Sequence, residues 1–583
     1  MTPTKILIAM VLSFAFSLTA QAAESATPPL AAKKPKVMTK FGDRRVDDYF
    51  WLREKAEPEV IDYLKAENAY TQEVMKPLEG FRDKLYKELL ARIKETDDSV
   101  PYRKRGYWYF KRELEGKQYP IYVRRKGSMD GPEEVLLDVN ELAKDRKYTA
   151  VGAMDVSPDG AKLAYTVDFT GFRQYQLQVK DLATGKPLTD SAERVTSLAW
   201  AADNATLFWV EEDETTKRSY RLNRRSLGHA QAEVVYEEKD EAFDIGVGDT
   251  RSEAFLTLTS VSKDTSEVRV LRSNEPRGAF RVVEPRRKGH EYYLDHHEGE
   301  FYIRTNDKGR NFRVVRAPLA DPARAHWREV VAHRPMVMLE EIDLFKDFWV
   351  LVERDKGLLK LRITDFASGK SHYIDFDEAV YTAHPGVNAE YATPTLQFTY
   401  ESLVTPLSWY EYDVASRSRK LLKQQPVLGG YDPANYASEA LTAVAKDGTR
   451  VPVSIVYRKS LRGDAPQPLL LYGYGSYGHP MDPNFRSSRV SLLDRGMIFA
   501  IAHIRGGGDR GKTWYDDGKL QKKKHTFEDF IAVADSLVRR KYTAPDKLVI
   551  QGGSAGGLLM GAVVNMRPDL FKAVVTQVPF VDV

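Results

Sequence analysis

The pattern of apolar and polar positions changes twice along this 583-residue chain, near residue 102 and again after Pro426. Before the first change, apolar residues recur every three or four positions from Val60 to Val74 and from Leu78 to Ile93. This spacing predicts two helices. Pro77 lies between the two runs and should separate them, because proline ends one helix and is tolerated in the first turn of the next.

Between about residues 102 and 422, short alternating strands replace the helical pattern, with Gly, Asp and Pro turns between them. An Asp-x-Ala-Thr/Ser motif begins at Asp181, Asp365 and Asp413, so its copies are 184 and 48 residues apart. These intervals are close to four units and one unit of about 46 residues, a period typical of β-propeller blades. The region is long enough for about seven blades, whereas two stacked β-sandwiches would not explain the fixed period.

After Pro426, strand-like runs alternate with helical runs. The strands are predicted at residues 468–472, 497–504, 548–551 and 573–578, and the clearest helix at residues 526–540. Alternation of this kind is typical of a parallel sheet built from βαβ units.

Charge and cysteine content exclude several classes of function. Lys and Arg number 87 against 83 Asp and Glu, a net charge of +4, which gives no reason to expect a nucleic-acid partner or an anionic membrane. The run Lys522–Lys524 is predicted to be a solvated loop face. The absence of cysteine excludes disulfides, thiolate metal sites and a cysteine nucleophile.

The amino terminus resembles a secretory signal. Lys5 precedes an apolar stretch, Ile6–Leu18, and small residues follow as far as Ala23. A membrane anchor is the alternative, but the apolar run is shorter than the about 18–20 residues needed to span a bilayer. We therefore expect residues 1–23 to be a cleaved signal peptide, the protein to be exported to the periplasm or secreted, and no stable membrane insertion.

The segment Gly552–Gly556 fits the Gly-x-Ser-x-Gly nucleophile elbow, with Ser554 at its centre. A strand-like run enters it and an apolar helical run leaves it, which is the context that the motif requires. The glycines are needed because the serine occupies a tight strand-to-helix turn with no room for side chains beside it. The alternative is a glycine-rich turn without catalytic function.

Other motifs carry less weight. Gly506–Gly511 matches Gly-x-Gly-x-x-Gly, but no apolar helical periodicity follows it, so we interpret it as a structural glycine loop rather than a dinucleotide site. The pair His296–His297 lies in the blade-like region and is predicted to be at the surface. Neither a Walker A motif nor His-Glu-x-x-His occurs, and we predict no cofactor and no metal.

A nucleophilic serine needs a base and an acid that orients the base. In α/β-hydrolases these follow the serine in the order Asp or Glu, then His. All eleven histidines of this sequence precede Ser554, and only 29 residues follow it. We therefore expect the triad Asp and His to lie past Val583, either because the sequence is an incomplete copy of a longer enzyme or because the chain is a truncated, inactive product that also folds poorly.

Long stretches in the same order resemble the prolyl oligopeptidase family of serine peptidases, and within it the oligopeptidase B group. They are Arg45–Arg53, Phe301–Asp307, Leu428–Tyr436 and Asn565–Phe571. The resemblance implies a mixed fold, a seven-bladed β-propeller capping an α/β-hydrolase domain that is incomplete at its carboxyl end. The expected limits are 24–97 for an extended and helical segment packing on the hydrolase, 98–425 for the propeller and 426–583 for the hydrolase.

The resemblance also assigns site residues. Ser554 matches the family nucleophile and Tyr474 the tyrosine whose hydroxyl donates to the oxyanion, with the backbone N–H of Ala555 as the second donor. Tyr477 resembles an aromatic wall of the substrate pocket. Asp482 resembles a carboxylate that favours a basic residue one position upstream, but the second acidic position of that subsite is Asn484 here, which weakens a preference for paired basic residues.

The expected activity is that of an endopeptidase that cuts short peptides after Arg or Lys through an acyl-enzyme on Ser554. The alternatives are cleavage after proline, an esterase, which leaves the propeller unexplained, and a catalytically dead protein that at most binds peptides. The expected partners are short peptides and no nucleic acid. The oligomeric state, monomer or dimer, is left open.

Overall fold

The computed structural model describes residues 27–581, so the predicted signal segment lies outside the described residues. The chain forms two compact units, Met1–Leu90 and Ala91–Val583. The first contains an antiparallel hairpin, β1 (Lys36–Lys40) and β2 (Asp43–Asp47), followed by the helices α1 (Pro58–Met75) and α2 (Glu79–Leu90). Pro77 lies in the 3-10 turn Lys76–Leu78 between the two helices, as the sequence predicts.

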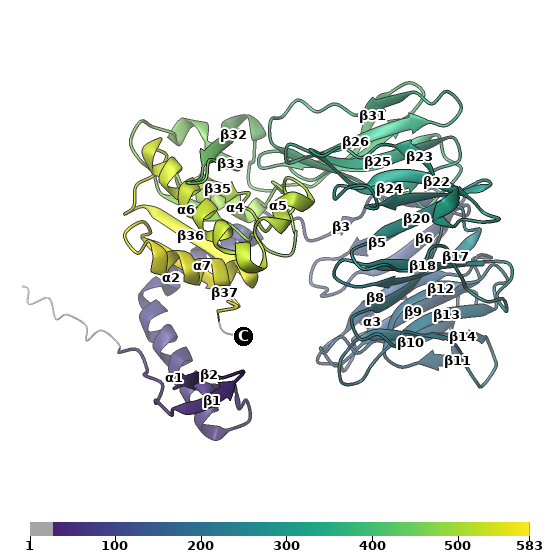
Figure 1. The fold of residues 1–583 in the computed structure, drawn as a ribbon, viewed down its shortest axis with the longest axis horizontal. Coiled ribbons are helices and arrows are strands. Elements are labelled where there is room, and N and C mark those ends of the chain that lie inside the picture. Colours follow the sequence, from purple (N-terminus) through teal and green to yellow (C-terminus); the bar gives the residue numbers. More distant parts are fainter. Residues whose placement is uncertain (1–26, 582–583) are drawn as a thin grey trace, which may run out of the picture. The chain divides into compact units, whose positions relative to one another are not determined.

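Seven antiparallel sheets form the propeller, as predicted (Figure 1). Blade 1 has five strands, β3 (Asp97–Asp98), β4 (Tyr102–Lys104), β5 (Tyr107–Glu113), β6 (Ile121–Lys126) and β7 (Glu133–Asp138), and the short helix α3 (Val139–Leu142) follows it. The six other blades have four strands each.

The strands of blades 2 to 4 are β8 (Ala150–Val156), β9 (Lys162–Asp168), β10 (Gln176–Asp181) and β11 (Pro187–Ala192); β12 (Val195–Trp200), β13 (Thr206–Glu212), β14 (Ser219–Ser226) and β15 (Glu233–Glu237); β16 (Asp244–Asp249), β17 (Phe255–Val261), β18 (Ser266–Arg272) and β19 (Arg281–Val282). Those of blades 5 to 7 are β20 (Tyr292–His297), β21 (Glu300–Thr305), β22 (Arg313–Pro318) and β23 (Arg328–Val331); β24 (Val337–Leu344), β25 (Phe348–Asp355), β26 (Leu358–Asp365) and β27 (Ser371–Tyr373); β28 (Tyr381–Pro385), β29 (Thr395–Ser402), β30 (Ser408–Asp413) and β31 (Ser418–Gln424).

The repeated Asp motif has one structural role in all three copies, which is to close the turn between the third and fourth strands of a blade. In blade 2 the Asp181 carboxylate accepts hydrogen bonds from the backbone N–H and the hydroxyl of Thr184, at 2.8 and 2.7 Å. Asp365 and Asp413 accept the same pair of bonds from the serines three residues later. Side-chain capping of this kind fixes a turn locally, which is why the motif recurs with the blade period.

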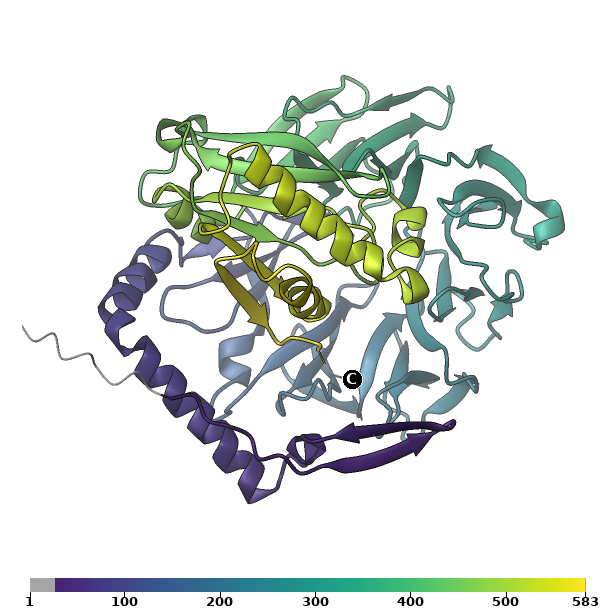
Figure 2. The same cartoon turned by 60° about the vertical axis from the view of Figure 1, so that its left-hand side comes forward.

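A six-stranded sheet forms the core of the α/β domain, with strand order β32-β33-β35-β34-β36-β37. Its strands are β32 (Tyr436–Val444), β33 (Arg450–Arg458), β34 (Leu469–Tyr472), β35 (Ile498–Ala502), β36 (Leu548–Gly553) and β37 (Ala573–Gln577), and its helices are α4 (Ser487–Leu493), α5 (Lys512–Asp516), α6 (Lys524–Arg539) and α7 (Ala555–Met566). Figure 2 shows α6 lying across the sheet with α7 beside it. The two helices share one apolar core with alternate residues of the strands, including Phe530, Leu537 and Met560, whereas α4 packs on the opposite face through Val490 and Leu493.

The four strands that the sequence predicts form a parallel set, as expected, and an antiparallel hairpin that the sequence did not predict makes the whole sheet mixed. Strands β34 to β37 are parallel, but β32 and β33 form an antiparallel hairpin, and β33 also pairs antiparallel with β35. The turn of the hairpin contains Asp447-Gly448, with Gly448 at φ +83°, a dipeptide that favours tight hairpin turns. The alternation of strand-like and helical runs in the sequence does not indicate the direction of β32 and β33.

His296 and His297 are buried, which corrects the prediction that they lie at the surface. Both end the innermost strand of blade 5, and their ring nitrogens find partners there. His296 Nδ1 lies 2.7 Å from the Ser252 hydroxyl. His297 Nδ1 lies 2.7 Å from the Tyr391 hydroxyl, while its ring stacks on Phe366 at 3.8 Å. A buried polar ring is acceptable once its nitrogens are hydrogen-bonded, and the histidine pair therefore belongs to the blade core.

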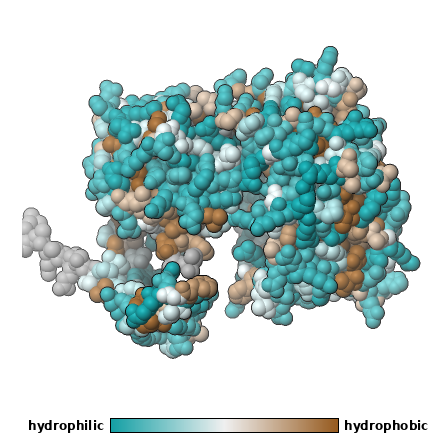
Figure 3. All heavy atoms as spheres, viewed as in Figure 1, coloured by the Kyte–Doolittle hydropathy of each residue, from teal (hydrophilic) through white to brown (hydrophobic). Residues whose placement is uncertain are grey.

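The face of the molecule drawn in Figure 3 is mostly hydrophilic, with apolar side chains in small separate groups. In residues 27–581, no helix is both long enough and apolar enough to cross a membrane.

Candidate active site

Ser554 occupies the strand-to-helix turn that the sequence predicts. It follows β36, precedes α7, and has φ +54° and ψ −117°, a conformation that a residue with a side chain rarely adopts. Its N–H donates to the carbonyl of Gln577 at 2.9 Å, and its carbonyl accepts from the N–H of Phe580 at 3.1 Å. The surroundings thus hold the strained residue in place, and its side chain is exposed at the carboxyl edge of the sheet.

The glycines around Ser554 are required by close backbone contacts. A Cβ at Gly552 would lie 2.2 Å from the carbonyl oxygen of Gly556, and one at Gly556 would lie 2.8 Å from the carbonyl oxygen of Gly473. A Cβ at Gly557 would lie 2.4 Å from the Cα of Pro579. No side chain fits at these three positions without moving backbone, which supports the sequence interpretation of the motif as an elbow.

Tyr474 lies beside the elbow because β34 is the parallel neighbour of β36. The chain leaves β34 at Tyr472, and Gly473 donates its N–H to the carbonyl of Gln551 at 3.3 Å. Burial raises the pKa of Tyr474, while a hydrogen bond with the Ser554 hydroxyl acts in the opposite direction. The phenol is therefore protonated at neutral pH and within hydrogen-bonding reach of the nucleophile, as an oxyanion donor must be.

The backbone N–H of Ala555, the other predicted donor, directly follows Ser554 in the chain. Ala555 is the first residue of α7, so its N–H has no carbonyl one turn earlier in the helix to donate to. The aligned peptide dipoles of the helix add positive potential at this end. The nucleophile, the tyrosine hydroxyl and the free N–H therefore converge on one edge of the sheet.

The loop after Tyr474 is held by a lysine from the run that the sequence predicts to be fully solvated. Lys523 donates its ammonium to the Gly475 carbonyl at 2.6 Å and to the Ser476 hydroxyl at 2.7 Å. Burial lowers its pKa to about 8. Lys522 and Lys524 are exposed, so the prediction holds for them and is wrong for Lys523, whose partners come from a loop 47 and 48 residues earlier.

The glycine loop Gly506–Gly511 is structural, and its sequence reflects steric need. A Cβ at Gly506 would lie 2.2 Å from the Gly475 carbonyl oxygen, and one at Gly508 would lie 2.2 Å from the Gly478 carbonyl oxygen. The loop thus packs directly against the segment that carries Tyr474 and Tyr477. The short helix α5 follows the loop, and its five residues are too few to show apolar periodicity.

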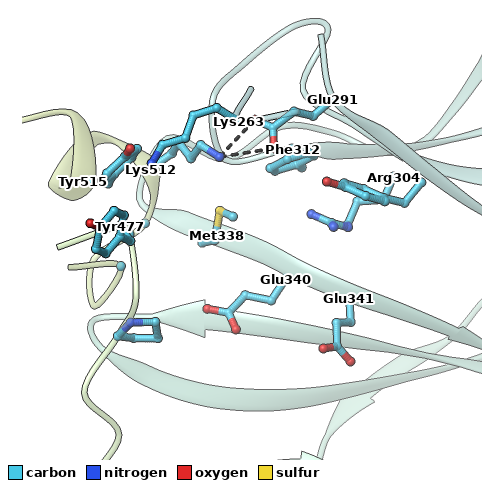
Figure 4. A pocket seen from close by; sticks show the side chains of 15 residues that line it. Lys263, Glu291, Arg304, Phe312, Met338, Glu340, Glu341, Tyr477, Lys512 and Tyr515 are labelled. Carbon is cyan, nitrogen blue, oxygen red and sulfur yellow. Dashed lines mark hydrogen bonds and ion pairs between the residues drawn. The ribbon is translucent and has the colours of Figure 1, made fainter. Parts of the chain in front are cut away.

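Tyr477 lies at the mouth of a cavity of about 390 Å³ between the α/β domain and blades 4 to 6 of the propeller (Figure 4). It is 61% exposed and has φ +60°. The Lys263 ammonium lies over its ring, 4.8 Å from the centroid. An accessible aromatic side chain in this position can form a wall of a binding site.

Asp482 does not line this cavity, and its carboxylate is already paired with a cation of the propeller. The Arg354 guanidinium lies 2.7 Å from one carboxylate oxygen of Asp482, and His384 lies 3.7 Å from the other. Although burial opposes the effect, the hydrogen bond with His384 and the charge of Arg354 hold the pKa of Asp482 well below its usual range. Arg354 itself is buried and also binds Glu340 at 2.5 Å.

Asn484, which replaces the second acid of the expected subsite, also bonds to the propeller. Its side-chain amide donates to Glu401 at 2.7 Å, and the N–H of Phe485 donates to the other oxygen of the same carboxylate at 2.7 Å. Asp482 and Asn484 therefore connect the α/β domain to blades 6 and 7. Sequence reasoning missed Arg354 and Glu401, because they lie far from residue 482 in the chain and no local motif marks them.

Within the described residues, no histidine or carboxylate contacts the Ser554 hydroxyl. A Ser–His–Asp arrangement does occur nearby, where His503 lies 2.7 Å from the Ser454 hydroxyl and 2.8 Å from Asp509. The three residues are only 6%, 8% and 3% exposed, and Asp509 also accepts the N–H of Met481 at 3.0 Å. This buried network holds the glycine loop and gives a substrate no access.

The described part of the chain contains no group of three or more His, Asp or Glu side chains placed to bind a metal ion. The arrangement brings together the Ser554 hydroxyl on its elbow, the Tyr474 hydroxyl and the first N–H of α7. These are the elements of acyl transfer.

Known proteins share this architecture. Residues 28–425 match the family model "Prolyl oligopeptidase, N-terminal beta-propeller domain", and residues 483–583 match "Prolyl oligopeptidase family". The chain is 45% identical to dipeptidyl aminopeptidase BI of Pseudoxanthomonas mexicana, over 100% of this chain and 83% of that protein, and 36% identical to protease 2 of Moraxella lacunata, over 95% and 81%. The solved structure of oligopeptidase B from Leishmania major superposes with a TM-score of 0.89 at 36% identity, covering 96% of this chain and 83% of that one.

Proposed function

The chain belongs to the prolyl oligopeptidase family of serine peptidases, and from this premise we propose that it hydrolyses short peptides after arginine or lysine through an acyl-enzyme on Ser554. The observation that carries the proposal is the convergence of the Ser554 elbow with the Tyr474 hydroxyl on adjacent parallel strands. The propeller restricts the substrate to chains small enough to reach this edge of the sheet.

The chemistry follows from the geometry. The Ser554 oxygen attacks the carbonyl carbon of the scissile bond, and the carbonyl oxygen takes up negative charge. The Tyr474 hydroxyl and the Ala555 N–H donate to that oxygen as the charge develops, an interaction that is stronger in the transition state than in the bound substrate. The proton that the Ser554 hydroxyl loses is transferred to the leaving nitrogen, which departs as the amine when the tetrahedral intermediate collapses to the acyl-enzyme. Water then attacks the acyl-enzyme, releases the acid and returns a proton to the Ser554 oxygen.

The serine proton needs an acceptor, and residues 27–581 place none against it. The test of the proposal therefore measures peptide binding as well as peptide turnover. A binding measurement and a turnover measurement together separate recognition from catalysis, which a turnover assay alone would not do.

The preference for basic residues rests on the family resemblance and on the similarity to protease 2 and oligopeptidase B. Cleavage after proline has less support, because the prolyl endopeptidase of Elizabethkingia meningoseptica is only 25% identical to this chain. Removal of dipeptides from a free amino terminus is a second candidate, favoured by the 45% identity to dipeptidyl aminopeptidase BI along the whole chain. Export after signal cleavage remains part of the proposal and rests on the composition of residues 1–23.

The test compares the chain with its Ser554→Ala variant. Binding of peptide aldehydes ending in Arg, Lys or Pro should favour Arg and Lys by about tenfold or more, and it should weaken in Ser554→Ala, because the aldehyde carbon bonds reversibly to the serine oxygen. Tighter binding of the Pro aldehyde would overturn the basic preference. Equal binding by both chains would exclude Ser554 as the nucleophile, and so would hydrolysis of an Arg-nitroanilide peptide that persists in Ser554→Ala.

A further inference from the structure

The cavity beside Tyr477 contains charged groups that the proposed chemistry does not use. Its propeller side is formed by the turn before β18 and by residues on β20, β21 and β24, and its other side by the loops after β34 and β35. Figure 4 shows the carboxylates of Glu340 and Glu341 and the guanidinium of Arg304 on the propeller side, opposite Tyr477. A volume of about 390 Å³ is within the range of sites that bind small ligands, and it can hold one or two residues of an extended peptide.

Two of the three acids in this cavity are already paired. Glu291 binds the Lys512 ammonium at 3.0 Å, and Glu340 binds the Arg354 guanidinium at 2.5 Å. Glu341 is different, because among residues 27–581 its carboxylate forms no ion pair, although the charges of His384 and Arg304 act on it from a greater distance. Solvent reaches its side chain, yet the surrounding protein and the neighbouring Asp343 raise its pKa. A carboxylate in this setting gains when a cation enters the cavity and pairs with it.

Arg304 complements Glu341 on the same wall. Its guanidinium lies between two rings, 4.6 Å from the centroid of Tyr293 and 4.3 Å from that of Phe312, and one of its nitrogens donates to the Leu339 carbonyl at 3.2 Å. The stacking fixes the plane of the guanidinium and leaves further N–H groups for a ligand. A peptide backbone presents carbonyl oxygens that such a group can bind.

The position of the cavity fits the substrate path. Tyr477 is three residues after Tyr474, so the two side chains leave the backbone within about 11 Å of each other even if the loop were fully extended. A peptide whose scissile carbonyl lies at Tyr474 therefore has its neighbouring residues within reach of the cavity. The aromatic side chains of Tyr477 and Tyr515 and the thioether of Met338 provide apolar surface on the way.

We propose that Glu341 is a specificity-determining residue of the propeller, which binds a cationic group of the peptide on the amino-terminal side of the scissile bond while Arg304 binds a backbone carbonyl. The inference rests on the proposed peptidase function and names a part of its substrate. It transfers to Glu341 the role that the sequence suggested for Asp482, since Asp482 is saturated by Arg354 and lies outside the cavity. The shared chemistry is an organic cation, which is either the ammonium of a free amino terminus or the side chain of Lys or Arg.

The experiment measures peptide binding, so that it does not depend on turnover. In the Ser554→Ala chain, dissociation constants are determined for three tripeptide amides: acetyl-Ala-Ala-Arg, which has no cation upstream of the arginine; Ala-Ala-Arg with a free amino terminus; and acetyl-Lys-Ala-Arg. Glu341→Gln is added to remove the charge with almost no change of shape. Glu193→Gln is the matched control, because Glu193 is an exposed propeller glutamate between β11 and β12, outside the cavity.

We expect one of the two cationic peptides to bind about tenfold more tightly than the acetylated reference, as a charge-assisted hydrogen bond should allow. Glu341→Gln should remove this difference, and Glu193→Gln should keep it. A gain for the free amino terminus would identify a site for chain ends, and a gain for the lysine peptide would identify a side-chain subsite. A charge reversal, Glu341→Lys, should reverse the preference in favour of a succinylated peptide.

Three results would overturn the inference. A preference for the cationic peptides that survives Glu341→Gln would place the cation elsewhere. Equal binding of all three peptides would show that the cavity does not distinguish a cationic group from a neutral one, while leaving the peptidase proposal intact. A complete lack of binding by the three peptides would overturn both proposals together.

Discussion

Replacement of Arg505 by methionine should strongly destabilise the α/β domain. Arg505 follows β35 and is 4% exposed, and its guanidinium makes two hydrogen bonds with Asp529 of α6, at 2.8 and 2.6 Å. The Asp529 side chain is fully buried. A third bond, to Asp447 at 2.7 Å, reaches a side chain that is 41% exposed.

The magnitude follows from this difference in burial. Loss of the bond to the exposed Asp447 should cost at most about 1 kcal/mol. Loss of the partner of Asp529 leaves a buried carboxylate without its cation, which costs about 3–5 kcal/mol. Methionine fills much of the vacated volume, so the charge term should dominate. We expect the free energy of unfolding to fall by about 3–5 kcal/mol, measured by urea denaturation at pH 8.

The pH dependence distinguishes this reasoning from a packing defect. Burial already raises the pKa of Asp529 in the native protein, and removal of Arg505 should raise it further. Between the unfolded pKa of about 4 and the raised native pKa, the native state holds more protons than the unfolded state, so stability falls as the pH rises. The deficit of Arg505→Met should therefore be smaller at pH 5 than at pH 8, and Arg505→Met/Asp529→Asn should recover about 2 kcal/mol. A loss under 1 kcal/mol, or one that does not depend on pH, would refute the argument.

Three further outcomes follow from the same structure. Gly556→Ala should lower the free energy of unfolding in urea by about 1–3 kcal/mol, because its Cβ would lie 2.8 Å from a backbone carbonyl oxygen. The control Gly553→Ala, whose nearest contacts are at 3.6 Å, should lower it by less than about 1 kcal/mol. Equal losses would contradict the steric account. Burial lowers the pKa of Lys523 to about 8, so on raising the pH the native state loses this proton before the unfolded state does. The free energy of unfolding, compared with that of Lys523→Met, should therefore increase from pH 8 to pH 10. A difference between the two proteins that does not change with pH would exclude Lys523 as its cause. Arg354→Met leaves Glu340 and Asp482 without their shared cation, so amide hydrogen exchange in residues 476–485 should accelerate by at least tenfold. The control Arg362→Met, on a neighbouring strand of the same blade, should leave the exchange rates of that segment unchanged.

The sequence indicates those parts of the molecule whose causes are local. The capped turns at Asp181, Asp365 and Asp413 form the same hydrogen bonds wherever they occur, so their spacing reveals the blades. The elbow is equally local, because the glycines at 552 and 556 are required by atoms within the motif and by one adjacent strand. Both features therefore follow from a short window of residues.

What the sequence does not indicate depends on contacts between distant segments. Arg354 and Asp482 are 128 residues apart, and nothing near either of them marks the ion pair. Lys523 looks like its two solvated neighbours, and only the loop at Gly475 distinguishes it. Glu341 is one of many propeller glutamates until the fold places it in a cavity opposite Tyr477. Residue type predicts the available chemistry, but burial and pairing decide which groups remain free to act.

Every blade of the propeller is built from consecutive strands, and none borrows a strand from the other end of the domain. The ring is therefore closed between blades 1 and 7 without a shared sheet. Side chains join these two blades, among them Lys423, which contacts Asp97, and Gln397, which donates to the Pro101 carbonyl at 3.1 Å. The backbone pairing of each blade is local in sequence and can form early in folding, and the closure between the first and last blades is the one joint that needs residues about 300 positions apart to meet. Because no connecting segment joins blades 1 and 7, we expect this seam to open first when the domain is strained and to form last during folding.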